Sequence, residues 1–431
     1  MITKIFTAET LRRREFKEKR KKEKGKNNLL PLPGFSRRLG VSAVILLFFF
    51  TSAYAQIAVK GETVWTMAGE PITNGIVLVN NGKIEAVGPA SGVNIPANYR
   101  VLSAKVVTPG LIDAHSVIGL NGYMNQPHDQ MAIESSGSVQ PELRAIDAYD
   151  AEEKLIEWVR GFGVTTIHTG HQPSALVSGQ TMIAKTTGRN VDEATVVPVA
   201  MIAVTLGQSA MAGTGKSPGT RAKQVAMLRA ELIKALENSK KTEAPKDLKS
   251  EIMMQVIKRE IPLLITAQKS QDIMSALRIA KEFNIRVVLD GVSDAHMLIN
   301  EIKASGFPVI VHPTMARAGG DSENMSITTA SKLKAGGIPV ALQSGYEGYV
   351  PKTRVILFEA ALAAANGLSR SDALALITID AAKILGLDKR IGSLAVGKDA
   401  DIAMYDGDPF EYTTHCIGTI INGRVVSEVA R

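Results

Sequence analysis

Four histidines lie at or just beyond the ends of short apolar runs, where side chains from several strands can converge. They are His115, His168, His171 and His312. Imidazole nitrogens ligate zinc, and a zinc ion lowers the pKa of its bound water to about 7, which makes that water a nucleophile. Such a site takes about three protein ligands. These residue types make metal-assisted hydrolysis the first chemistry to test against the sequence.

Two interpretations of these histidines are open. In the first, His115 together with His168 and His171 supplies three nitrogens, and His312 is a further candidate. In the second, His168 is a hydrogen-bonded interior residue and His171 a loop residue, because histidines on apolar strands are usually structural. We favour the second interpretation, since the sequence offers no evident carboxylate to orient the rings.

One glycine-rich segment, residues 210–217, has the spacing A-x4-G-K-S of a permissive phosphate loop. In such a loop, backbone amides hold phosphates and the lysine, here Lys216, reaches the β and γ oxygens. A helix should then begin directly at the segment, but Pro218 and Gly219 follow it. We therefore predict a mobile loop after a strand here, not a nucleotide site.

The chain from residue 108 onward has the pattern of a scaffold that brings strand ends together. Apolar runs such as 263–267 and 308–312 alternate with helical stretches such as 271–283. Strands separated by helices of about 10–15 residues indicate a parallel sheet. Seven or eight such units over about 280 residues predict an α/β fold, a (β/α)8 TIM-like barrel with one mouth at its strand ends.

Short strands without intervening helices are expected at both ends of this barrel. Asn80-Asn81-Gly82 and Asn422-Gly423 predict hairpin turns, because Asn-Gly favours positive φ. We expect these strands to meet in one small β-sandwich domain built from both chain ends. The predicted parts of the chain are a basic leader and signal peptide, the N-terminal part of the sandwich, the barrel, and the C-terminal part of the sandwich: residues 1–55, 56–107, 108–389 and 390–431.

The first 55 residues differ in charge from the rest of the chain. They hold 13 Lys/Arg and four Asp/Glu, whereas the remaining residues hold 37 and 38. The body therefore gives no electrostatic reason to bind nucleic acid. The basic segment, the apolar run 41–50 and Ala53-Tyr54-Ala55 predict a signal peptide that is cut after Ala55. We expect an exported, periplasmic protein without a permanent membrane span; a signal anchor is the alternative.

Five motifs resemble those of the amidohydrolase superfamily, specifically its imidazolonepropionase-like and related exported members. They are residues 74–89, 108–115, 163–166, 391–401 and 423–426. The resemblance covers nearly the whole mature chain. It implies hydrolysis of non-peptide C–N bonds, such as amides and cyclic amides, by water on one or two divalent metals. In this family the first barrel strand supplies His-x-His, the fourth in some members a carboxylated lysine, the fifth and sixth a histidine each, and the eighth an aspartate that also acts as base.

The resemblance also implies that most of this ligand set is missing. His115 is present, but Val117 takes the place of the second histidine. Gly291 stands where the sixth strand would supply a ligand, and Gly345 where the eighth would supply the aspartate. Valine cannot coordinate and glycine has no side chain, so both the metal site and the general base are degenerate.

The polar residues near the other strand ends are candidates for a ligand pocket. They are Thr266, Gln268, Asp290 and Gln343. We expect the positions 115, 266, 268, 291 and 345 to converge on one hollow at the barrel mouth.

Two functions remain open at this stage. The first is a metal-depleted, catalytically impaired pseudoenzyme without a cofactor, which binds a small amide-like or peptide-like ligand or supports a partner, either a second copy or an active paralogue. The alternative is an active hydrolase of non-peptide C–N bonds with an atypical site. That site would use His115, His168 and His312 to hold zinc or another divalent metal.

Overall fold

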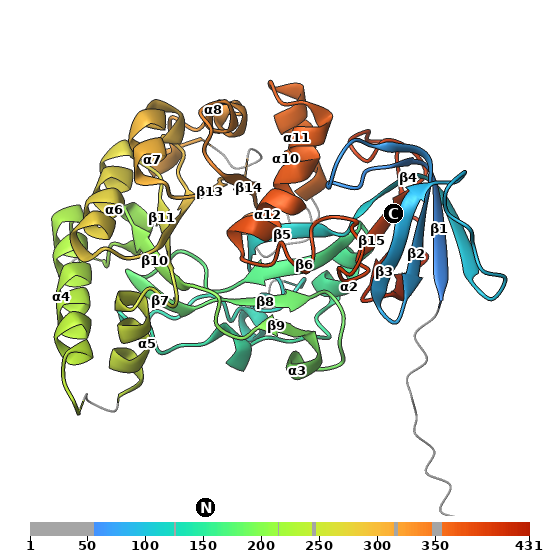
Figure 1. Cartoon of the computed structure of the whole chain (residues 1–431). Helices are drawn as coiled ribbons and strands as arrows, with labels where there is room; N and C mark the ends of the chain where they lie inside the picture. The colour runs from blue at the N-terminus through green and yellow to red at the C-terminus, as the bar shows by residue number, and fades with distance from the viewer. Residues whose placement is uncertain (1–55, 125, 214, 244–246, 314–317, 347–355) are drawn as a thin grey trace, which may run out of the picture. The chain divides into compact units, whose positions relative to one another are not determined.

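The computed structural model describes residues 56–431 except 125, 214, 244–246, 314–317 and 347–355 (Figure 1). The chain divides into two compact units, Met1–Thr51 and Ser52–Arg431. The first unit, and with it the predicted leader and signal peptide, lies outside the described residues. No helix in the described part of the chain is both long and apolar enough to cross a membrane.

Strands from both ends of the described chain form one seven-stranded sheet, in the order β17-β16-β15-β4-β1-β2-β3. Strand β4 pairs with β1 in parallel and with β15 antiparallel, and so joins the two ends. The predicted turns are confirmed, with positive φ at Asn81 and Gly82 and at Asn422 and Gly423. The second layer of the predicted β-sandwich stays a prediction. The strands are β1 Ile57–Val64, β2 Ile72–Asn80, β3 Lys83–Pro89, β4 Arg100–Pro109, β15 Ile402–Tyr405, β16 Cys416–Ile421 and β17 Arg424–Ser427.

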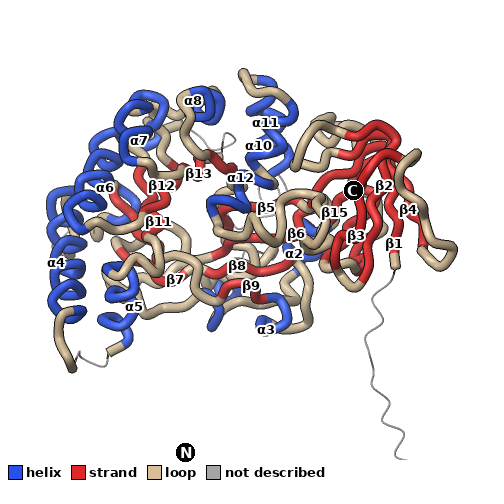
Figure 2. The backbone as a smooth tube through the Cα atoms, viewed as in Figure 1, coloured by secondary structure: helices blue, strands red, loops and turns tan. Residues whose placement is uncertain are grey.

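The middle of the chain forms two further sheets, with orders β14-β13-β12-β11-β10-β7 and β5-β6-β8-β9 (Figure 2). Strands β10 to β14 run parallel, as predicted. Their bounds are β5 Leu111–Ser116, β6 Val164–Thr169, β7 Val177–Gln180, β8 Met182–Lys185, β9 Thr195–Val197, β10 Ile202–Leu206, β11 Leu263–Ala267, β12 Val287–Gly291, β13 Val309–Val311 and β14 Val340–Leu342.

The α/β fold is confirmed, but the strands of the described residues form two separate sheets and no single closed (β/α)8 barrel, so barrel closure stays a prediction. Between β6 and β10 the chain forms short antiparallel strands, β7, β8 and β9, instead of a strand followed by a crossover helix. The two sheets still approach each other at both edges. Ser116, at the end of β5, forms an isolated parallel bridge with Gly345, just beyond β14. At the other edge only Thr181 separates β7 from β8, and its amide donates to Met201 O, just before β10.

Helices cover the outside of the six-stranded sheet (Figure 1). Helix α6 shows why: Ile273, Ala276 and Ala280 are buried at helical spacing. Several N-termini are capped by side chains, such as Thr220 for α4 and Asp247 for α5. The helices are α2 Lys154–Arg160, α3 Val191–Ala194, α4 Arg221–Ser239, α5 Leu248–Ile257, α6 Ser270–Phe283, α7 Ile299–Ser305, α8 Thr329–Ala335, α10 Ile356–Ala365, α11 Arg370–Leu376 and α12 Ile379–Ile384.

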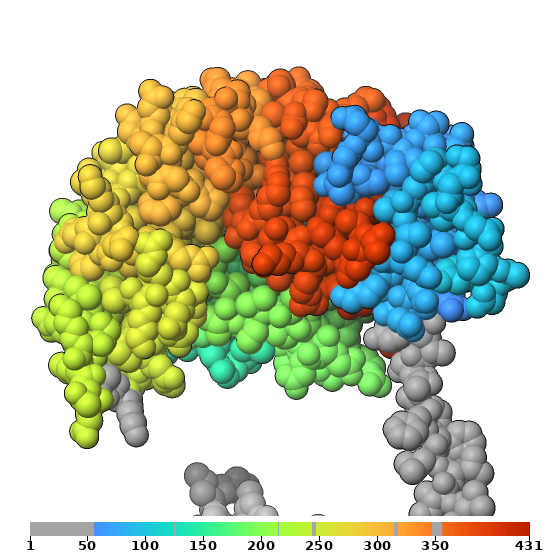
Figure 3. All heavy atoms as spheres, viewed as in Figure 1, coloured from blue at the N-terminus to red at the C-terminus, as the bar shows by residue number. Residues whose placement is uncertain are grey.

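Parallel strands covered by helices are apolar on both faces, and β11 is buried at all five of its residues. The seven-stranded sheet is tied to this core by a buried ion pair between Lys185 on β8 and Asp401 before β15. The surface view shows the C-terminal residues in contact with the N-terminal sheet (Figure 3). The strands β5, β11, β12 and β14 belong to the same compact unit as the seven-stranded sheet.

Candidate functional site at the strand ends

Asp290, near the end of β12, is the centre of a buried polar cluster. Its side chain is fully buried. Four side chains approach its carboxylate from β5, β11 and the end of β14. His115 Nδ1 lies 3.0 Å from Oδ1, and Gln343 Nε2 donates to the same oxygen at 2.9 Å. Thr266 Oγ1 donates to Oδ2 at 2.6 Å, and the Tyr346 hydroxyl donates to it as well.

These contacts keep Asp290 ionised. Burial alone acts to raise the pKa of Asp290, but the charge and hydrogen bond of His115 and the hydroxyls of Thr266 and Tyr346 outweigh it. The net result is a pKa below the ordinary value of an aspartate. The pKa of Tyr346 is raised well above its usual range, by burial and by the Asp290 charge. Tyr346 therefore remains a hydroxyl donor.

His115 has one nitrogen engaged and one free. Because Asp290 is a carboxylate, His115 Nδ1 carries the proton and donates to it. Within the described chain, Nε2 is buried and has no hydrogen-bond partner. The ring packs edge-on against Tyr346, with centroids 4.8 Å apart, and lies 5.5 Å from the ring of His168.

Asp113 links β5 to β14 behind the cluster. It accepts hydrogen bonds from the Ser344 amide at 3.1 Å and from the Ser344 hydroxyl. The His115 amide also donates to it, at 3.3 Å. Burial raises the pKa of Asp113 to about 6, although these hydrogen bonds oppose the shift. Asp113 thus braces the strand that carries His115.

The other predicted histidines do not join Asp290. His168 donates from Nδ1 to Ala114 O at 2.7 Å, and Nε2 accepts from Thr181 Oγ1 at 2.6 Å. Burial lowers the pKa of His168 to about 3, so both nitrogens are satisfied in a neutral ring. His312 Nδ1 lies 3.1 Å from Pro313 O, and Nε2 is unpartnered in the described chain. Burial lowers its pKa to about 4.

No three His, Cys, Asp or Glu side chains in the described part of the chain are grouped closely enough to hold a metal ion. His115 and Asp290 are in contact, but with each other. A catalytic zinc takes about three protein ligands. The described donors therefore do not fit the metal that the family resemblance implies.

The three positions predicted to be degenerate are closed by their neighbours. Val117 is fully buried in the main hydrophobic cluster. Gly291 has φ +75°, and a Cβ there would collide with the Gln268 amide. Gly345 has φ +95°, and a Cβ would lie 2.7 Å from Pro313 Cγ. A ligand-bearing side chain at either glycine needs both a strained backbone and a displaced neighbour.

Gln268, which was predicted as a ligand-pocket candidate, hydrogen-bonds to Ser293 and not to Asp290. Its Oε1 accepts from the amide and the hydroxyl of Ser293, at 3.1 and 2.7 Å. The structure thus brings together His115, Thr266, Asp290 and Gln343, but not Gln268 or His312. Tyr346 was missed; its place one residue after Gly345 is the only signal in the sequence.

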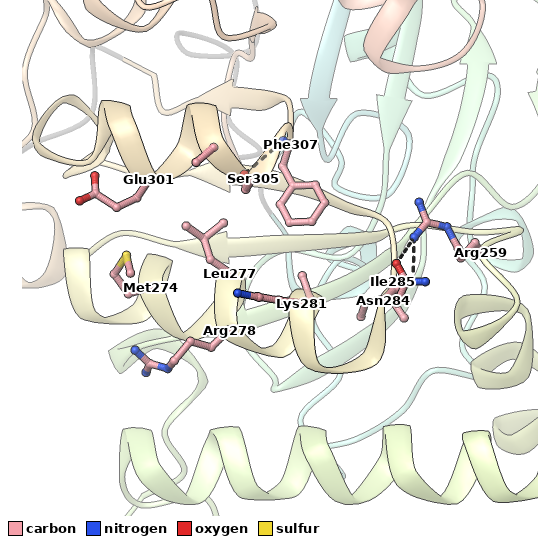
Figure 4. A pocket seen from close by; sticks show the side chains of 12 residues that line it. Arg259, Met274, Leu277, Arg278, Lys281, Asn284, Ile285, Glu301, Ser305 and Phe307 are labelled. Atoms are coloured by element: carbon pink, nitrogen blue, oxygen red, sulfur yellow. Dashed lines mark hydrogen bonds between the residues drawn. The ribbon is translucent and has the colours of Figure 1, made fainter.

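A hollow of about 690 Å³ lies elsewhere, between α6 and α7 (Figure 4). Arg259 donates to the side chain of Asn284 at its rim, at 2.6 Å. Leu277 and Phe307 line it together with the basic Arg278 and Lys281 (Figure 4). None of the predicted site residues lines this hollow, so it is not the strand-end site.

Comparison with known proteins identifies a family and solved structures that this chain resembles. The family model described as "Amidohydrolase family" matches residues 344–427. An amidohydrolase from Thermotoga maritima MSB8 is similar in structure, with a TM-score of 0.82 and 28% identity, over 86% of this chain and 100% of that one. No curated protein matches the chain.

Two more distant structures share the fold. An adenosine deaminase from Xanthomonas campestris with bound zinc has a TM-score of 0.52 and 16% identity, over 86% of this chain and 93% of that one. A prolidase complexed with N-methylphosphonate-L-proline has a TM-score of 0.57 and 15% identity, over 87% of this chain and 100% of that one. The chain is therefore similar to the amidohydrolase family over residues 344–427 and shares the architecture of the Thermotoga amidohydrolase.

Proposed function

We propose that this protein is a metal-depleted pseudoenzyme of the amidohydrolase superfamily, impaired or inactive in the hydrolysis of C–N bonds. One observation carries the proposal: the buried carboxylate of Asp290 is already satisfied by four protein donors. A cation at this point would have to displace these donors. Within the described residues, the side chains that contact Asp290 leave two buried atoms without a partner, His115 Nε2 and Gln343 Oε1, and these are too few to complete a catalytic zinc site.

The missing base supports the same proposal. In metal-dependent hydrolysis a carboxylate removes a proton from the metal-bound water. Gly345 has no side chain at the position where the family resemblance implies that carboxylate, and Pro313 fills the adjacent space. Asp113 is near, but the amide and hydroxyl of Ser344 hold it in a bracing role.

The protein's binding partner, its fold closure and its location in the cell are part of the same proposal. A small amide-like or peptide-like ligand, a second copy of the chain or an active paralogue would be the binding partner, and no cofactor is needed. The TIM-like closure of the two central sheets and the β-sandwich of the chain ends belong to the same proposal. So does export to the periplasm with cleavage after Ala55, which a mature N-terminus at Gln56 would support and an uncleaved chain would refute.

The alternative is an active hydrolase with an atypical site at His115, His168 and His312. The free Nε2 atoms of His115 and His312 favour it. The two hydrogen bonds of His168 count against it, because that ring would have to give up one of them to bind zinc.

Metal analysis combined with assays separates the two functions. The protein is purified without chelators, its metal content is measured by mass spectrometry, and amides, cyclic imides and short dipeptides are tested as substrates. We expect well under one metal ion per chain and no turnover. Stoichiometric zinc, iron or manganese with chelator-sensitive turnover would establish the alternative instead.

A further inference from the structure

A second hollow, of about 460 Å³, lies between two loops outside the strand-end cluster around Asp290. One wall is the loop 133–138, which belongs to the long segment after β5. The other is formed by residues 210–213, 216 and 217 after β10, and residues 174–175 before β7 complete the hollow. Small-ligand sites commonly have volumes of about 300–1,000 Å³. The hollow is therefore large enough for a small ligand.

Its lining is polar and carries both signs of charge. Five serines line it: Ser135, Ser136, Ser138, Ser174 and Ser217. Glu134 supplies a carboxylate and Lys216 an ammonium group. Hydrogen bonding from the Ser136 amide, at 2.7 Å, and from its side chain lowers the pKa of Glu134, so the carboxylate is ionised at neutral pH.

The walls are fixed by hydrogen bonds within the fold. Ser138 Oγ donates to Ser217 O at 2.7 Å and joins the two loops. The Lys216 amide donates to Gly213 O at 2.9 Å, so it closes a turn and is not free to hold a phosphate. Helix α4 begins only at Arg221. These features disagree with a phosphate loop and agree with a pocket wall.

Two groups in the hollow have no partner. Within the described residues, Ser174 Oγ is buried and makes no hydrogen bond. A buried hydroxyl without a partner is uncommon and costs free energy. Across the same described ranges, the Lys216 ammonium group has no hydrogen-bond or ion-pair partner either.

We propose that this hollow binds a small zwitterion, with a carboxylate on Lys216, an ammonium group on Glu134 and polar atoms on the serines. The inference rests on the ligand-binding part of the proposed function and names its ligand class. It does not depend on the state of the strand-end cluster, because Asp290 and its donors do not line the hollow.

A series of ω-amino acids tests the proposal, because its members differ only in the distance between the two charges. Glycine, β-alanine, γ-aminobutyrate and ε-aminohexanoate are titrated into the full-length protein by calorimetry, with hexanoate and hexylamine as single-charge probes. One chain length should bind best, and the single-charge probes should bind about tenfold more weakly or worse. Equal binding of hexanoate or hexylamine, or no binding of any member at about 20 mM, would overturn the proposal.

Matched variants locate the binding. Lys216→Met and Glu134→Gln should each weaken the binding of the tightest-bound ω-amino acid about tenfold or more. Ser174→Ala should weaken it by a smaller factor. Lys223→Met and Glu237→Gln, on the exposed side of α4, should leave it unchanged. Binding that persists in both pocket variants would place the ligand elsewhere and refute the proposal. Because metal and turnover are not measured here, a working metal centre would overturn the proposed function and leave this result standing.

Discussion

Asp290 is a buried anion whose two oxygens are both hydrogen-bonded by the protein. Its donors come from sequence positions as far apart as His115 and Tyr346. Such a carboxylate is costly to bury alone and is tolerated because it is fully paired. At the residue scale, a structural polar cluster stands where the family resemblance implies a cation.

Asp290→Asn should destabilise the protein by about 2–4 kcal/mol, since an amide cannot accept from all four donors and leaves buried groups unpaired. Urea unfolding monitored by circular dichroism measures this free energy. Tyr346→Phe is the matched comparison, because it removes one donor and leaves the carboxylate; about 1–2 kcal/mol is expected. A variant Asp290→Asn that is as stable as the wild type would show that Asp290 is not a structural centre.

Asp113 should make stability depend on pH. Its pKa is about 6 in the folded protein against 3.8 as the ordinary value, and burial is the main cause. The folded state keeps this proton where the unfolded chain has lost it, so the contribution of Asp113 to stability falls as pH rises from about 4 through 6. The stability of Asp113→Asn should therefore rise relative to that of the wild type as pH increases over this range, by at most about 3 kcal/mol.

Unfolding curves at pH 4, 5, 6 and 7 for both proteins check this prediction. The difference between the two is the useful quantity, because the pH dependence of other carboxylates, such as Asp399, is common to both. A difference that stays constant with pH would contradict the assigned direction.

Much of the strand-end chemistry could be predicted, because a residue's type and its place in a motif are local. His115 was predicted as the remaining metal ligand, and Thr266, Asp290 and Gln343 as ligand-pocket candidates near strand ends. In the structure, His115, Thr266 and Gln343 all contact the carboxylate of Asp290. Tyr346 and the orientation of Gln268 could not be predicted, since a contact over 56 residues and a rotamer set by Ser293 depend on packing.

At the scale of elements, the hairpins and the parallel strands were predictable from turn residues and apolar runs. The strands β7, β8 and β9 were not. They are only three or four residues long and include polar residues such as Ser178, Gln180 and Lys185. Their pairing depends on distant partners such as β6 and β10, which no local pattern reveals. For that reason the expected closed barrel appears as two sheets.

The ion pair Lys185–Asp401 joins β8 to the segment just before β15, and both side chains are only 3% exposed. Lys185→Met should cost about 3–5 kcal/mol of unfolding free energy, because it leaves a buried unpaired carboxylate. Asp401 also accepts from the Asn422 amide at 2.9 Å. The double variant Lys185→Met/Asp401→Asn keeps that bond and should recover part of the loss.

The exposed pair Arg189–Glu193 is the control, and Arg189→Met should change stability far less than Lys185→Met does, because solvent screens the exposed charges. Denaturant unfolding of the four proteins measures all of these values. If Lys185→Met costs no more than Arg189→Met, the buried pair does not hold the sheet to the core.

At the scale of the whole molecule, the chain keeps the architecture of a hydrolase superfamily while its strand-end donors are turned toward one another. The seven-stranded sheet fixes both chain ends, and the parallel strands fix the positions where ligands would stand. Under the proposed function, the fold is preserved without the metal chemistry. Fold alone does not establish activity, and the site decides.

Anomalous X-ray diffraction at the zinc absorption edge, from crystals grown with excess Zn²⁺, tests this account most directly. The account predicts no anomalous peak within bonding distance of His115 Nε2 or Asp290, and Asp290 still bound to His115, Thr266, Gln343 and Tyr346. A full-occupancy peak at that point, with these side chains turned toward it, would contradict it.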